Sequence, residues 1–302
     1  MIFSHVYSGE VNLVDTKKYR LIVRAVELNS LTLAGQELGL TQSGASRALA
    51  ELEKELGFAL LTRSRGGVRP TTNGNLVLPT IRTILAAEEK LEQISSGILG
   101  IEKGVISVGT FTSVAVHWLP GIIKEFERLH PGIEFRLFSG DYSDVSAWLS
   151  DGTVEVGFVS DIVPPKCAYS PLRDDRLMLI LPKDHPYAQY RRLSLSYVEN
   201  EDFITLNENS DQDTRRAFAA AGIRPNVKFT TKDDYAIISM VEKGIGISIM
   251  PELLLRGHLD KIAAIPLDPP LKRNVGIALA PGASPAAKSF ADTVKNWLRR
   301  GN

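Results

Sequence analysis

The first part of the chain, up to about Pro70, places its apolar residues at the spacing of amphipathic helices. These residues recur every three or four positions, as one face of a helix with about 3.6 residues per turn requires. We therefore expect short helices, followed by a strand–turn–strand segment that ends near Pro70. The pattern is carried by Tyr19, Ile22, Val23, Val26, Leu33, Leu38, Leu40, Ala45, Leu49, Leu52 and Leu56.

A single long helix is predicted for the second region, residues 72–100. We expect Thr72 to cap its N-terminus and Pro79, in its first turns, to kink it. An apolar seam with heptad spacing runs along this helix, which predicts either packing on its own domain or a dimer interface. We favour the dimer, because the helix is long and joins two regions of different pattern. The seam consists of Val77, Ile84, Leu91 and Ile98, with Thr80, Ala87 and Ile94 three positions further on.

The third region, from Gly104 to the end, alternates short apolar strands with helices. This alternation predicts an α/β domain with mostly parallel sheets and right-handed crossovers. The expected strands are 105–108, 133–138, 154–159, 177–181, 203–206, 227–230, 246–249 and 275–279, and the expected helices are 114–130, 145–150, 214–221, 235–242 and 286–300.

Composition adds three constraints to this picture. The chain has 302 residues, and because a single core stops growing near ~250–300 residues, two or more domains are favoured. The formal net charge is zero, so any surface that binds nucleic acid must be local. The single cysteine, Cys167, excludes an intrachain disulfide and fits a reducing compartment. We interpret its thiol as inert, with a redox sensor as the alternative.

No apolar run approaches the ~18–20 residues that cross a bilayer. Residues 1–15 contain polar and acidic positions and lack the apolar stretch of a secretory signal. We therefore expect a cytoplasmic protein.

Residues 30–56 carry the sharpest signal for function. Either Ser30 or Thr32 can cap a short helix over 33–38, a turn follows at Gly39-Leu40, and Thr41 can cap a second helix. Helix, short turn and helix form the geometry with which a recognition helix enters the DNA major groove by its N-terminal end. The segment therefore predicts a helix-turn-helix.

The second helix opens with side chains suited to DNA. Gln42 can form paired hydrogen bonds with an adenine edge, and Arg47 can bind a guanine edge or a phosphate. Ser43 and Ser46 can donate to phosphates, and Thr41 leads this turn into the groove.

A basic hairpin follows the second helix. Residues 60–65 and 68–70 flank Gly66-Gly67, which predicts a β-hairpin with a Gly-Gly turn. Arg63, Arg65 and Arg69 gather there, as in a wing that contacts phosphates or the minor groove. A merely solvated surface is the alternative, and the neighbouring helix-turn-helix disfavours it.

From Tyr19 to Thr72 the chain resembles the LysR-type transcriptional regulators. It departs from the family pattern at Ala34-Gly35, where the family has Ala-Ala, and at Gly44-Ala45, where the family often has Pro-Ala. The resemblance implies a winged helix-turn-helix domain over 1–71, a dimerisation linker helix over 72–100 and an effector-binding domain over 104–302. It implies two α/β lobes like those of type 2 periplasmic-binding proteins, with lobe one over 104–163 and 268–302, and lobe two over 164–267.

Three loops are candidates for the effector site, because ligands of open α/β sheets bind beyond the carboxyl ends of strands. They are residues 110–113, 140–143 and 207–211. The resemblance points first to Ser113 and Ser143 as effector contacts. Thr112, Asn207 and Ser210 are further candidates, and ordinary helix capping is the alternative for each residue. Helix N-termini there favour an organic anion, although Asp141, Glu208 and Asp211 oppose it.

The sequence lacks nucleophile-elbow, zinc-protease, phosphate-loop and dinucleotide-binding motifs. We expect no enzyme activity, no cofactor and no metal. The predicted function is a DNA-binding regulator controlled by a small molecule. The expected partners are double-stranded DNA, the effector, a second copy in a dimer, and, from the resemblance, a tetramer and RNA polymerase. A solute-binding component and an enzyme, for which Asp141 with Asp211 is the candidate pair, are the alternatives.

Overall fold

The computed structural model describes residues 16–64, 66–98, 103–160, 164–207 and 212–301. The chain forms two compact units. One contains residues 1–92 with 151–153, and the other contains residues 93–150 with 154–302. Within the described residues, no helix combines the length and the apolar character needed to cross a bilayer.

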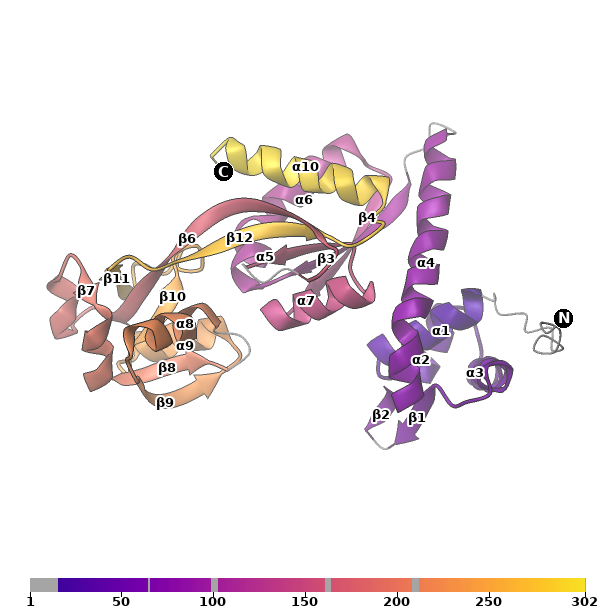
Figure 1. Ribbon diagram of the computed structural model, residues 1–302, viewed down its shortest axis with the longest axis horizontal. Coiled ribbons are helices and arrows are strands. Elements are labelled where there is room, and N and C mark those ends of the chain that lie inside the picture. Colours follow the sequence, from indigo (N-terminus) through magenta and orange to yellow (C-terminus); the bar gives the residue numbers. More distant parts are fainter. Residues whose placement is uncertain (1–15, 65, 99–102, 161–163, 208–211, 302) are drawn as a thin grey trace, which may run out of the picture. The chain divides into compact units, whose positions relative to one another are not determined.

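Among its described residues, the first unit contains three short helices, a hairpin and most of a long helix, whose arrangement Figure 1 shows. Its core joins Tyr19 and Ile22 with Leu49, Leu52 and other residues of the predicted apolar pattern. The spacing therefore indicated the buried faces of α1 and α3, but Leu33, Leu38 and Leu40 of the same pattern are exposed. The elements are α1 (Thr16–Glu27), α2 (Leu31–Glu37), α3 (Gln42–Leu56), β1 (Leu61–Ser64), β2 (Gly67–Pro70) and α4 (Thr72–Ile98).

Local hydrogen bonds confirm the predicted helix-turn-helix. Ser30 rather than Thr32 caps α2, because its Oγ accepts from the backbone N–H of Leu33 at 3.2 Å. Gly39 then takes a left-handed conformation with φ +71°, which glycine adopts without steric cost. Thr41 caps α3 by accepting from the N–H of Gly44 at 3.1 Å.

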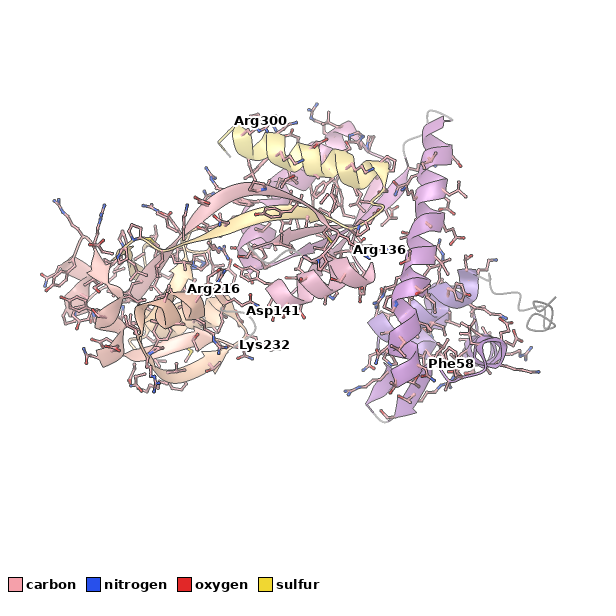
Figure 2. All side chains as sticks on the ribbon, in the orientation of Figure 1. Phe58, Arg136, Asp141, Arg216, Lys232 and Arg300 are labelled. Carbon is pink, nitrogen blue, oxygen red and sulfur yellow. The ribbon has the colours of Figure 1, made fainter. Side chains whose placement is uncertain are left out.

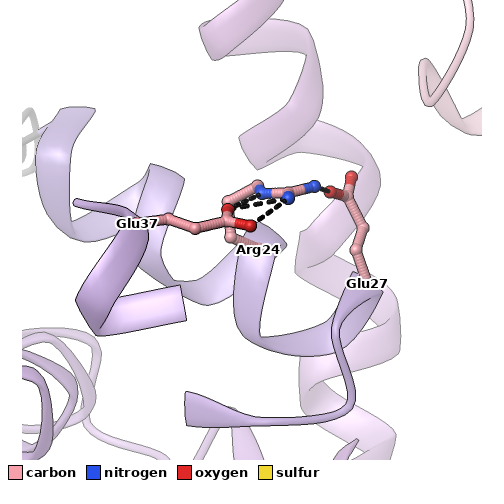
Figure 3. Close-up of polar contacts among 3 residues, drawn as sticks. All are labelled: Arg24, Glu27 and Glu37. Carbon is pink, nitrogen blue, oxygen red and sulfur yellow. Dashed lines mark hydrogen bonds and ion pairs between the residues drawn. The ribbon is translucent and has the colours of Figure 1, made fainter. Parts of the chain in front are cut away.

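An ion pair fastens α2 to α1 (Figure 3). The Arg24 guanidinium donates to both carboxylate oxygens of Glu37, with N–O distances of 2.7 to 3.0 Å, and it also donates to Glu27 within its own helix. Because the Arg24–Glu37 contact is bidentate, it fixes the orientation of the two groups as well as their separation.

The long helix α4 differs from its prediction at its start. The hydroxyl of Thr71, not Thr72, accepts from the N–H of Gly74 at 2.8 Å, so the cap lies one residue earlier. The predicted end at Gly100 lies outside the described residues. Leu78 and Ile81 are buried in the core of the first unit.

The predicted seam of α4 divides into two parts. Val77 and Ile84 pack against the core of the first unit. Leu91 is 64% exposed and Ile94 is 42% exposed. Among the seam residues whose side chains the structure describes, Val77 and Ile84 of the first half therefore pack on their own domain, and Leu91 and Ile94 do not.

The second unit is built around an eight-stranded sheet within the described residues, with a separate pair of strands. The order is β4-β3-β5-β12-β6-β11-β7, with β10 also paired to β6, and β8 pairs with β9. The strands are β3 (Gly104–Thr110), β4 (Ile133–Ser139), β5 (Val156–Val159), β6 (Ala168–Pro182), β7 (Leu193–Ser194), β8 (Asp202–Leu206), β9 (Asn226–Thr231), β10 (Ser248–Pro251), β11 (Ile262–Asp268) and β12 (Lys272–Leu279).

The expectation of mostly parallel sheets is wrong for the middle of this sheet. Strand β12 runs antiparallel to both β5 and β6, and β6 runs antiparallel to β10 and β11. Residues 168–176 of β6 pair with β12, whereas residues 177–182 pair with β10 and β11. These two long strands therefore run from one lobe to the other (Figure 1).

Helices cover the two lobes. The predicted helix over 114–130 is two helices, which meet at Trp118 because Pro120 lies in the first turn of the second one. The sequence also failed to indicate β11 and β7. The helices are α5 (Thr112–His117), α6 (Leu119–Leu129), α7 (Tyr142–Asp151), α8 (Gln212–Ala221), α9 (Asp234–Glu242) and α10 (Pro285–Arg299), with short 3₁₀ turns at Pro186–Gln189 and Leu195–Asn200.

Candidate functional site

The first turn of α3 presents its polar side chains to solvent. Thr41, Gln42, Ser43 and Arg47 are exposed, and Ser46 is half-buried. The opposite face of α3 is fixed, because Ala45, Leu49 and Leu52 are buried in the core of the first unit. The residues predicted to contact DNA therefore share one outward face of a helix that the core holds in place.

The hairpin brings basic residues to the same helix. Strands β1 and β2 pair antiparallel, and Arg63 and Arg69 are both exposed. The Arg63 guanidinium lies 3.4 Å from the Ser46 hydroxyl, so the hairpin and α3 form one polar surface. The third predicted residue, Arg65, lies outside the described residues.

Asn29, which the sequence reading did not single out, holds the hairpin against the helices. Its side chain donates to the carbonyl of Gly66 at 2.8 Å and accepts from the N–H of Val68 at 2.9 Å. A Cβ on Gly67 would lie within 2.6 Å of Asn29 atoms, and Gly67 has φ +102°. No sequence pattern indicated this role, because the hydrogen bond between Asn29 and Val68 joins positions 39 residues apart.

The second unit contains a cavity of about 300 Å³ to which both lobes contribute. Its wall combines an apolar floor with many hydroxyl and charged groups, a mixture typical of small-molecule sites. The lining residues are Phe111, Thr112, Ser113, Ser139, Gly140, Asp141, Tyr142, Asp144, Leu177, Leu206, Asp213, Thr214, Lys232, Asp234, Ile249, Met250, Pro251, Leu254 and Arg273.

The predicted effector residues divide with respect to this cavity. Thr112 and Ser113 line it. Ser143 does not; it is exposed, and its hydroxyl donates to Asp141 at 2.5 Å. Asn207 does not line it either, although its neighbour Leu206 does. Ser210 lies outside the described residues, as does Asp211, a member of the pair considered for catalysis.

The sequence reading missed Arg273, which organises one end of the cavity. Its guanidinium donates to Ser113 Oγ at 2.6 Å, to Tyr142 Oη at 2.7 Å and to the Asp175 carboxylate at 2.7 and 2.9 Å. It also lies over the ring of Phe111, 5.1 Å from the centroid. Arg273 is only 4% exposed. Burial raises the pKa of the Tyr142 hydroxyl, which keeps it protonated.

Acidic groups dominate the other parts of the wall. Burial raises the pKa of Asp234, and the hydroxyl of Thr112, which donates to this carboxylate, partly offsets the rise. Asp213 accepts from Arg216 at 2.6 Å. Figure 2 shows Asp141, Arg216 and Lys232 in the same part of the molecule, and both Asp141 and Lys232 line the cavity.

Two of the helices beside the cavity, α7 and α9, are capped by carboxylates of the protein, whereas α5 begins after Phe111 without a side-chain cap. Asp141 accepts from the N–H groups of Ser143 and Asp144 at the start of α7, at 2.8 and 3.0 Å. Asp233 accepts from Tyr235 and Ala236 at the start of α9, at 2.9 and 3.2 Å. Of the helix N-termini on which the expectation of an organic anion depended, the one at 140–143 is therefore occupied by a carboxylate of the protein itself.

The structure also bears on metal binding and on the reactivity of Cys167. Among the described residues, no group of three or more His, Cys, Asp or Glu side chains is arranged to hold a metal ion. Cys167 is half-buried, and burial raises the pKa of its thiol. Because the thiolate is the reactive form of cysteine, this environment favours the inert interpretation.

Known proteins resemble this chain along nearly its whole length. The bacterial regulatory helix-turn-helix protein model of the lysR family matches residues 16–75, and the LysR substrate binding domain model matches residues 100–299. The uncharacterized HTH-type transcriptional regulator YvbU of Bacillus subtilis (strain 168) is 31% identical over 282 residues, which cover 91% of this chain and 96% of the relative. The probable HTH-type transcriptional regulator LrrA of Synechococcus elongatus is 29% identical, with 93% and 97% covered.

Solved structures share the fold. A full-length OxyR variant from Pseudomonas aeruginosa matches with a TM-score of 0.72 and 20% identity, over 93% of this chain and 97% of that chain. The effector binding domain of QuiR in complex with shikimate matches with a TM-score of 0.60 and 23% identity, over 66% and 98%. Both relatives named above are described as HTH-type transcriptional regulators. The chain belongs to the LysR family, and it is a DNA-binding transcriptional regulator with an effector-binding domain.

Proposed function

We propose that α3 reads promoter DNA with its first turn. The observation that carries this proposal is the division of α3 into a buried face and an exposed polar face with Gln42, Ser43 and Arg47. Thr41, Ser46 and the wing arginines Arg63, Arg65 and Arg69 contact the phosphate backbone. Recognition helices that enter the major groove by their N-terminal end use these residue types for base edges and phosphates.

The effector is a small molecule that binds in the cavity between the two lobes. Thr112 and Ser113 contact it directly, because they line the cavity. Ser143 and Asn207 act at its margin through their neighbours Asp141 and Leu206, which reach the wall, and Ser210 belongs to the adjoining loop.

Binding changes the angle between the lobes, since β6 and β12 connect them and β6 exchanges its strand partners between the two lobes. A differential effector affinity worth ~1–3 kcal/mol would change promoter occupancy several-fold or more.

The regulator works as a dimer through α4 and as a tetramer through the effector domains. Leu91 and Ile94 leave an exposed apolar stripe on the long helix. The edge strands β4 and β9 each expose large apolar side chains, Leu137 at 52%, Val227 at 46% and Phe229 at 40%. Covering such exposed apolar side chains with a second copy of the chain would remove them from water and stabilise the oligomer. The dimer places two recognition helices on one operator, in the cytoplasm where the chromosome lies, and RNA polymerase is its transcriptional partner.

Selection of genomic fragments by the purified full-length chain tests the proposal. We expect enrichment of promoter fragments at moderate salt, and loss of that enrichment for Arg47→Ala. Ser113→Ala should still enrich the same fragments, but the metabolite extract that changes binding of the parent chain should no longer change it. Absence of any preferred fragment, with or without the extract, would contradict the proposal.

A further inference from the structure

The cavity contains two chemically different ends, and together they describe a ligand. At one end, Ser113 and Tyr142 each hydrogen-bond to Arg273, at 2.6 and 2.7 Å. A guanidinium has donors but no acceptor. Both hydroxyl oxygens must therefore be the acceptors of these bonds, and both hydroxyl protons point away from Arg273.

These two protons favour an acceptor in the cavity. Ser113 is 3% exposed and Arg273 is 4% exposed, so the group is built into the protein and not placed loosely on its surface. The Arg273 charge lies directly behind the two hydroxyls and strengthens them as donors. A ligand carboxylate, with two oxygens and a negative charge, matches this end.

The other charged residues of the cavity wall favour a positively charged group on the ligand. Within the described residues, the cavity is lined by four carboxylates, Asp141, Asp144, Asp213 and Asp234, and by two cations, Lys232 and Arg273. Two ion-pair partners lie outside the wall: Asp175, which pairs with Arg273, and Arg216, which pairs with Asp213. They add one negative and one positive charge, so the excess of carboxylates is unchanged. A ligand with only negative charge would therefore be repelled by this excess of carboxylates.

Asp234 is the carboxylate best placed to bind a cation. It starts α9, but the cap of that helix is Asp233, so Asp234 is not used to terminate the helix. Its carboxylate instead accepts from Thr112 of the other lobe. Asp213 lies near Tyr142, also across the two lobes, and is largely buried beside Arg216.

Apolar residues of lobe two complete the wall. Leu177, Ile249, Met250 and Leu254 line the same cavity, and such a floor binds the carbon skeleton of a small molecule. The wall therefore offers a site for a carboxylate, a site for an ammonium group and an apolar surface for the carbon skeleton of the same ligand.

We propose that the effector is a free amino acid, whose carboxylate binds Ser113 and Tyr142 in front of Arg273 and whose ammonium group binds Asp234 with support from Asp213. This assignment rests on the proposed function, because it names the ligand of the effector cavity. It keeps the anionic group that the sequence predicted and adds a cationic group on the opposite side. Since Asp234 and Ser113 belong to different lobes, one ligand that binds both of them also favours closure.

The test is a binding panel on the full-length chain. Free amino acids are screened by thermal shift, and their affinities are measured by calorimetry. Each amino acid that binds is compared with two analogues: the amine that lacks its carboxylate, and the 2-hydroxy acid that has a hydroxyl in place of its amino group. We expect at least one amino acid to bind, and both derivatives to bind about tenfold more weakly or worse, because each lacks one charge-assisted contact. Equal binding of the 2-hydroxy acid, or no binding by any amino acid, would overturn the assignment.

Two variants locate the contacts. Asp234→Asn should weaken binding of the amino acid about tenfold or more, whereas the 2-hydroxy acid should bind as tightly as before or more tightly, because one repelling carboxylate is removed. Asp292→Asn on α10, whose carboxylate is 71% exposed, is the matched control and should bind as the parent chain does. Equal loss of both ligands in Asp234→Asn would contradict a contact with the amine. If promoter binding responded to a compound without an amine, the proposed regulatory function would stand and only the assignment of an amino acid as the effector would be wrong.

Discussion

Arg273 and Asp175 form a buried ion pair between directly opposed residues of β12 and β6. Their side chains are 5% and 6% exposed, and Arg273 donates to one Asp175 oxygen from Nε at 2.9 Å and from Nη2 at 2.7 Å. The other Asp175 oxygen accepts from the N–H of Leu253 in lobe two. The pair thus lies where the connecting strands leave one lobe and enter the other.

Arg273→Met should destabilise the effector domain strongly. The substitution leaves the Asp175 carboxylate buried with its cation removed, which costs about 3–5 kcal/mol. Urea unfolding followed by circular dichroism measures the change. Lys272→Met is the control on the same strand, because its ion pair with Asp174 is largely exposed and should contribute less than about 1 kcal/mol. Similar losses in the two variants would contradict the importance of burial.

Arg47→Ala should weaken binding to the selected promoter fragment about tenfold or more. A good contact between arginine and a guanine edge contributes ~1–3 kcal/mol of discrimination, and the truncation leaves the buried face of α3 unchanged. Gel-shift titration at one fixed salt concentration measures the affinity. Arg191→Ala, an exposed arginine of the effector domain, should bind like the parent chain. An Arg47→Ala variant with full affinity would remove this residue from the DNA-binding surface.

Arg69→Ala should change how binding depends on salt. Each phosphate contact that is lost lowers the slope of log affinity against log salt by about 0.9, because fewer counterions are released. The loss should be similar for specific and unrelated DNA, since a phosphate contact carries no base information. Lys54→Ala, at the far end of α3, is the control. A slope equal to that of the parent chain would place Arg69 away from the DNA backbone.

Leu91→Asp should dissociate the dimer. Burying a leucine side chain stabilises an interface by ~1.5–3 kcal/mol, and the variant replaces two such side chains with charges, so the dimer dissociation constant should rise more than about tenfold. Sedimentation velocity measures the oligomer. Leu259→Asp, at a position that is 56% exposed in the effector domain, should leave the dimer intact. A fully dimeric Leu91→Asp protein would exclude this face of α4 from the interface.

Asp234→Asn should raise the melting temperature at neutral pH. Burial raises the pKa of Asp234 in the folded chain above its ordinary value of 3.8, despite the opposing effects of Thr112 and Arg273. An acid with a raised folded pKa disfavours the folded state above that pKa, and this penalty disappears as the pH falls toward the ordinary value. The two melting temperatures should therefore converge in acid. A lower melting temperature for Asp234→Asn at neutral pH would show that the charged carboxylate stabilises the fold.

Some features of the cavity were visible in the sequence and others were not. Thr112 and Ser113 come just after the end of β3, separated from it by Phe111, so the rule that ligands lie beyond strand ends indicated them. Ser143 satisfied the same rule, but it donates to Asp141 and does not line the cavity. Strand topology tells where a loop lies, whereas the direction of a side chain depends on its own hydrogen bonds.

By itself, the sequence determined the helix-turn-helix, the cap at Thr41, the hairpin and the alternation of strands and helices, whereas the choice of Ser30 over Thr32 as the cap of α2 came from the structure. These features depend on contacts among residues a few positions apart, which a linear pattern records. The tertiary structure alone decided that Arg273 would meet Ser113, 160 positions away, and Asp175, 98 positions away. Such contacts leave no local pattern, because they arise only when antiparallel strands bring distant segments together and exclude water from the charges between them.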